Sequence, residues 1–180
     1  MIPSLIRWKR GSVMINSCIY FVEGACEEKL INALKEPPEK LLPGKVRVLN
    51  VIQNEIPRSI LLAIRHGTKV VLVFDTDVPY TEQLKKNLVH LKKYCSGIKV
   101  IYLAQVLTIE DELVRCTDVS RLRDLTRSKS DSDFKRDFCA LKDCRSLLER
   151  HNLNIKGLWV KEPPETFQFV VRNANQIKVS

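Results

Sequence analysis

The chain has 180 residues, of which 44% are hydrophobic and 28% are charged, and its formal net charge is +9. This length and composition are typical of a soluble globular domain that is large enough to bury a substantial core. The excess of Lys and Arg favours an anionic partner, with nucleic acid ahead of a membrane surface. No apolar stretch approaches the roughly 20 residues of a membrane span, so no membrane association is expected.

Taken in chain order, the first residues carry no signal of export. Residues 1–14 contain basic residues without an apolar run after them, so we expect an N-terminal arm, and Met14 offers an alternative start. The six cysteines form no C-x-x-C pair and show no zinc-finger spacing with the histidines. Reduced thiols in a cytoplasmic protein, several of them in the core, are therefore expected.

Apolar runs and helical periodicity then alternate along the chain. Strands are predicted at 18–22, 45–52, 69–74 and 98–103, with helices at 25–35, 56–67 and 81–95 and another from 108. This order predicts an α/β fold, with a parallel four-stranded sheet flanked by helices.

The C-terminal third is less regular. The stretch 118–133 is polar and is interpreted as a linker or mobile loop. A helix is expected over 134–151, and the apolar runs GLWV and FQFVV are interpreted as short final strands. The expected organisation is an arm at 1–14, a core at 15–117, the polar loop at 118–133, and a C-terminal helix and strands at 134–180 packed on the core.

Acidic residues follow two of the predicted strands. Glu23 comes after the first strand and is followed by Gly24, while Asp75 and Asp77 end the third. Because ligands bind at the carboxyl ends of parallel strands, these side chains are expected to converge. Converging carboxylates repel one another and raise one another's pKa values, and a divalent cation removes that conflict. Oxygen ligands favour Mg²⁺ or Mn²⁺ over zinc.

These motifs resemble a known family. FVEGACEEKL followed by VLVFDTDV is similar to the Toprim domain of topoisomerases, primases and nucleases, and the resemblance covers roughly residues 18–116. The later TIEDEL resembles an additional acidic motif of the OLD-type (overcoming lysogenization defect) nuclease branch. The resemblance implies a Rossmann-like Toprim core and a metal-dependent nuclease.

The resemblance also implies roles for individual residues. Glu23 would act as general acid/base or metal ligand, Asp75 and Asp77 would hold Mg²⁺, and Glu110 or Asp111 would help to hold a second ion. A lysine downstream would offset charge on the phosphodiester, and both Lys135 and Lys142 are candidates. The implied partners are DNA, tRNA or another RNA, together with an ATPase subunit and a second copy of the chain, in an antiphage defence or toxin system.

Plainer interpretations exist for several of these residues. Asp75 and Asp77 could form a solvated turn before Pro79, and Thr108 with Asp111 fits a helix capping box. Exposed cations usually form only a solvated face, but near an acidic metal site they could contact phosphates. The candidates for nucleic-acid binding are Lys85, Lys86, Lys92 and Lys93 on one predicted helix, and Arg121, Arg123 and Arg127 in the polar loop.

Two other functions compete with the nuclease. A Toprim module that binds nucleic acid or a partner protein without catalysis would carry the same fold. A haloacid-dehalogenase-like phosphatase fits FDTDV, but that family carries its motif on the first strand, whereas here two predicted strands precede it. The phosphatase therefore ranks below both Toprim interpretations.

Overall fold

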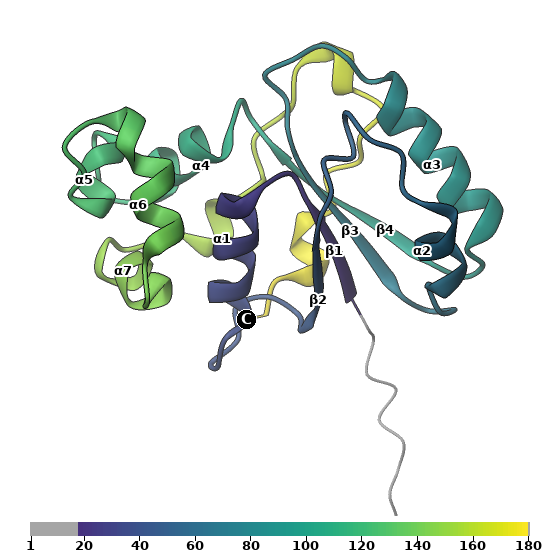
Figure 1. Cartoon of the computed structure of the whole chain (residues 1–180), viewed down its shortest axis with the longest axis horizontal. Helices are drawn as coiled ribbons and strands as arrows, with labels where there is room; N and C mark the ends of the chain where they lie inside the picture. Colours follow the sequence, from purple (N-terminus) through teal and green to yellow (C-terminus); the bar gives the residue numbers. More distant parts are fainter. Residues whose placement is uncertain (1–17, 180) are drawn as a thin grey trace, which may run out of the picture.

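The protein is built on a parallel sheet, as the sequence predicts. The structure is a computed structural model that describes residues 18–179. Four parallel strands lie in the order β2-β1-β3-β4 (Figure 1). Their bounds are β1 Cys18–Val22, β2 Gly44–Val48, β3 Lys69–Asp75 and β4 Lys99–Gln105. The predicted N-terminal arm lies outside the described residues.

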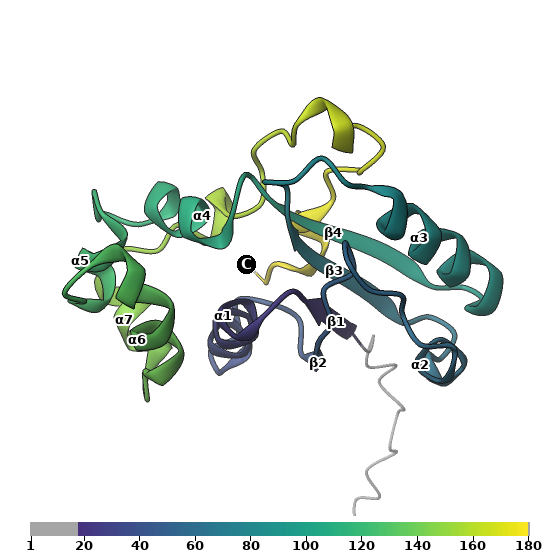
Figure 2. The same ribbon diagram turned by 45° about the horizontal axis from the view of Figure 1, so that its top comes forward.

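Helices cover both faces of the sheet. Alternate strand residues such as Tyr20 and Val71 pack under α1 (Ala25–Lys35) and α4 (Ile109–Cys116). On the other face, residues such as Leu72 pack under α2 (Arg58–Ala63) and α3 (Glu82–Tyr94). Figures 1 and 2 show α2 and α3 on one side of the sheet, and α1 with the later helices on the other. The strands are apolar on both faces because both faces are buried.

Two elements of the core were predicted too long. The strand β2 ends at Val48 instead of residue 52, because the Asn50 side chain accepts hydrogen bonds from the amides of Ile52 and Gln53 and holds a turn there. The helix α2 ends at Ala63, so Gly67 does not cap it. Gly67 instead forms the turn before β3, with a positive φ of 80° that favours glycine.

The polar stretch 118–133 is more ordered than predicted. It contains α5 (Leu122–Thr126) and a 3-10 turn, η1 (Asp131–Asp133), and the Leu125 side chain is fully buried. The single helix expected over 134–151 is divided into α6 (Phe134–Ala140) and α7 (Cys144–Arg150). These helices pack beside α1 as an α-helical layer (Figure 2).

The two predicted C-terminal strands are wrong. The segment instead forms 3-10 turns, namely η2 (Ile155–Gly157), η3 (Glu165–Phe167) and η4 (Ala174–Ile177). Its apolar side chains fill the core without pairing in the sheet. Phe167 stacks on Phe74 with ring centroids 5.8 Å apart, and Trp159 is buried at a positive φ of 56°.

The outer strand β4 is partly covered by a side chain. The Asn173 amide accepts a hydrogen bond from the Tyr102 amide and donates one to the Val100 carbonyl, both at 2.9 Å. The asparagine thus occupies backbone groups of β4 that a further strand would use. Within residues 18–179, no helix combines the length and the apolar character that a membrane crossing needs.

Candidate functional site

The predicted acidic residues Glu23 and Asp75 meet at the carboxyl edge of the sheet. β1 and β3 are paired neighbours, and each is followed by, or ends in, one of these residues. The Asp75 backbone amide donates a hydrogen bond to Glu23 Oε2 at 3.2 Å. This bond holds the Glu23 side chain beside the end of β3.

Glu27, in the first turn of α1, belongs to the same group of carboxylates, and we call Glu23, Glu27, Asp75 and Glu110 the acidic cluster. It is 5% exposed, and its Oε2 accepts a hydrogen bond from the Gly24 amide at 2.9 Å. Burial raises the pKa of the Glu27 carboxyl, and the negative charges of Glu23 and Glu110 raise it further. Gly24 has room for this contact because it lacks a side chain.

The neighbouring residues Glu110 and Asp111 make different contacts. Asp111 completes a capping box, because its carboxylate accepts from the Thr108 amide while its own amide donates to the Thr108 hydroxyl. Glu110 instead faces Lys135 of α6, with 3.0 Å between Oε1 and Nζ. The hydrogen bond to Glu110 raises the pKa of the Lys135 ammonium group.

Asp75 has the most perturbed carboxyl group of the cluster. Burial and then the charges of Glu23, Glu27, Glu110 and Asp77 raise the pKa of Asp75 to about 8. Asp77 itself is exposed in the loop after β3. The ionised form of Asp75 is therefore disfavoured unless a further positive charge lies beside it.

The donor chemistry fits a divalent cation. Asp75 Oδ1 and Glu110 Oε2 are shielded from solvent without a hydrogen-bond partner, which leaves two carboxylate oxygens free to bind an ion. Oxygen ligands of this kind suit Mg²⁺ or Mn²⁺. Among residues 18–179, however, no three His, Cys, Asp or Glu side chains stand in a ready metal-binding arrangement.

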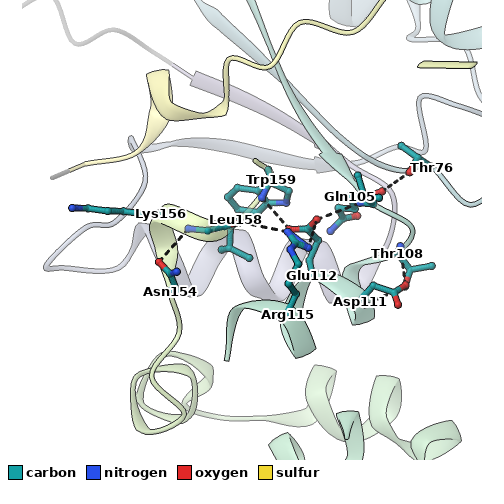
Figure 3. A network of polar contacts seen from close by, with 12 residues as sticks. Thr76, Gln105, Thr108, Asp111, Glu112, Arg115, Asn154, Lys156, Leu158 and Trp159 are labelled. Atoms are coloured by element: carbon teal, nitrogen blue, oxygen red, sulfur yellow. Dashed lines mark hydrogen bonds and ion pairs between the residues drawn. The ribbon is translucent and has the colours of Figure 1, made fainter. Parts of the chain in front are cut away.

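A neighbouring network of buried polar groups was not predicted. Glu112 is fully buried and accepts hydrogen bonds from the amides of Val106 and Trp159, and Arg115 donates two more to it (Figure 3). The carboxylate therefore joins the end of β4, α4 and the C-terminal segment. Gln105, which pairs with Asp75 across β3 and β4, is also fully buried. Its side-chain amide has no hydrogen-bond partner within residues 18–179.

The predicted cationic residues occupy several parts of the molecule. Lys85 and Lys86 lie in the first half of α3, which begins after the β3 loop, whereas Lys92 and Lys93 lie in its last turn, near the amino edge of the sheet. Lys142 is exposed in the turn between α6 and α7. Arg121, Arg123 and Arg127 lie at or in α5.

The six cysteines form no disulfide within residues 18–179. The sulfur atoms of Cys26 on α1 and Cys139 on α6 lie 3.4 Å apart. Burial raises the pKa of the Cys26 thiol, and its contact with Cys139 adds to that rise. The contact lies between α1 and α6, the helix that carries Lys135.

Comparisons with protein-family models, with curated proteins and with solved structures found no match.

Proposed function

We propose that this protein is a metal-dependent nuclease that hydrolyses phosphodiester bonds of DNA or RNA. The observation that supports the proposal is the hydrogen bond that holds Glu23 beside Asp75 at the carboxyl edge of the sheet, with the Glu110–Lys135 ion pair close enough to act on Asp75 electrostatically. A buried carboxyl group with a raised pKa, such as that of Asp75, is typical of functional sites. The proposed setting is a cytoplasmic antiphage or toxin system with an ATPase partner.

Each residue has a proposed task. Asp75, Asp77 and Glu110 would hold Mg²⁺ or Mn²⁺, which when bound polarises the phosphodiester and lowers the pKa of a coordinated water. Glu23, held by the Asp75 amide, would accept and return a proton. Lys135 would offset charge on the phosphodiester, and Lys85 and Lys86 would contact flanking phosphates.

The test is cleavage of plasmid DNA, linear DNA and tRNA with Mg²⁺, with Mn²⁺ or with EDTA. We expect metal-dependent cleavage by the natural chain and loss of at least about 100-fold in rate for Glu23→Gln, within the range for a general acid/base. The exposed Glu39→Gln variant is a matched control and should cleave normally.

Other outcomes would favour the competing functions. Nucleic-acid binding without cleavage under every metal condition would favour a non-catalytic Toprim module. Hydrolysis of small phosphate monoesters that depends on Asp75, with no cleavage of nucleic acid, would favour the phosphatase.

A further inference from the structure

Positive charge gathers at the amino edge of the sheet, opposite the acidic cluster. Lys69 and Lys99 begin β3 and β4, and Lys45 is the second residue of β2. Along β3, the six residue steps from Lys69 to Asp75 span about 20 Å at ~3.3 Å per step. This edge is therefore separate from the candidate nuclease site.

A groove lies at this edge, between α2 and the strands β1 and β2. Its volume is about 350 Å³, which is near the lower end for small-molecule sites, roughly 300–1,000 Å³. Among residues 18–179, its lining includes three cations and three isoleucines but no carboxylate. These residues are Lys45, Arg47, Arg65, Ile19, Ile60 and Ile64.

The three cations of the groove have no partner of opposite charge. Within residues 18–179, Lys45, Arg47 and Arg65 form no ion pair, and Arg47 Nε is shielded from solvent without a hydrogen bond. A shielded donor without a partner is costly, and like charges around one concave surface repel. A bound anion would relieve both costs.

The rest of the groove is apolar. Ile19, Ile60 and Ile64 pack against the core on the α2 face, and they leave an aliphatic surface between the cations. A bare inorganic anion would use only the cations, whereas a ligand that joins a phosphate to a flat, weakly polar ring would use both surfaces.

We propose that this groove is a nucleotide-binding site, in which Arg47 and Lys45 contact the phosphate and the isoleucines contact the base. The planar fork of Arg47 suits two phosphate oxygens at once. The nucleotide is either free or one unit of a nucleic-acid strand. The site does not depend on the nuclease proposal, because it shares no residue with the acidic cluster.

The test is binding by the full chain, in low salt with EDTA, of adenosine 5′-monophosphate, a four-nucleotide single strand, adenosine and inorganic phosphate. We expect the monophosphate or the oligonucleotide to bind more tightly than adenosine or phosphate. Arg47→Glu should weaken that binding at least about tenfold, the loss expected for a charged hydrogen bond. Lys129→Glu, which makes the same charge change at an exposed site on the other side of the sheet, should not.

The remaining outcomes are decisive as well. Competition of the monophosphate with the oligonucleotide identifies a free nucleotide as the ligand. Binding of the oligonucleotide without binding of the monophosphate identifies a strand. Lys45→Glu, at an exposed position, replaces Arg47→Glu if the latter does not fold. No binding of any probe, binding unchanged in the variants, or binding only after deletion of residues 1–13 would overturn the proposal. Glu23→Gln, which should abolish cleavage, should retain nucleotide binding, so the two proposals can fail separately.

Discussion

At the scale of single residues, Asp75 gives the clearest dependence on pH. Its folded-state pKa of about 8 lies above its ordinary 3.8, so the folded protein binds this proton more tightly than the unfolded chain does. Ionised Asp75 therefore destabilises the fold. The penalty is absent at pH values below the ordinary pKa, and it grows as the pH rises through the interval up to the folded-state pKa.

We predict that Asp75→Asn stabilises the metal-free protein at alkaline pH and not at acid pH. The expected gain at pH 8.5 is roughly 2–4 °C in melting temperature, which corresponds to about 1 kcal/mol in a chain of this size. Thermal melting in EDTA across the pH range checks it. An equal gain at pH 4 would show that repulsion among the carboxylates is not the cause.

Lys135 and Lys142 can now be distinguished. Only Lys135 contacts an acidic-cluster residue, and its side chain remains 69% exposed. We predict that Lys135→Ala lowers the cleavage rate by roughly 10–100-fold with an unchanged melting temperature, because exposed ion pairs add little stability. Lys142→Ala, measured in the same assay, should cleave as the natural chain does. Equal rates for the two variants would contradict the assignment.

At the scale of elements, α4 depends on Glu112. Replacing Glu112 by Gln removes the charge that pairs with Arg115 and turns an amide donor toward a backbone donor. We predict a loss of about 3 kcal/mol, as for breaking a buried ion pair. Denaturant unfolding measures it. Glu82→Gln, at a side chain that is 81% exposed, is the control and should change stability by no more than about 0.5 kcal/mol.

The sequence predicts elements well where one local signal decides the structure. Continuous apolar runs such as Val70–Phe74 have one stable place, inside a sheet covered on both faces. GLWV and FQFVV carry a similar local signal, but they form no strand. Asn173 occupies the β4 edge, and Phe167 packs on Phe74. Such competition between segments cannot be seen in a short apolar run.

In the candidate site, too, the sequence predicts only the residues that a local signal places. Glu23 and Asp75 could be placed together because strand ends in a parallel sheet share an edge. Glu112 and Gln105 could not, because their importance follows from burial beside distant segments, and nothing in their neighbouring residues signals it. The choice of Lys135 over Lys142 depends on where α6 breaks, which local pattern did not indicate.

At the scale of the whole molecule, the two edges of the sheet carry opposite charge. The carboxyl edge holds Glu23, Asp75 and Glu110, and the amino edge holds Lys45, Lys69 and Lys99. The net charge of +9 is therefore unevenly distributed. An anionic polymer would be attracted to the amino edge and the helices, and it would approach the acidic cluster only with a cation bound there.

The Asn173 amide also limits how copies of the protein can add to one another. A sheet polymerises into a fibre only when both of its outer strands accept a neighbour. Asn173 closes the β4 side, and within residues 18–179 β2 is the remaining outer strand. Growth by edge-to-edge pairing would thus stop after two copies, because the Asn173 side chain blocks pairing at β4.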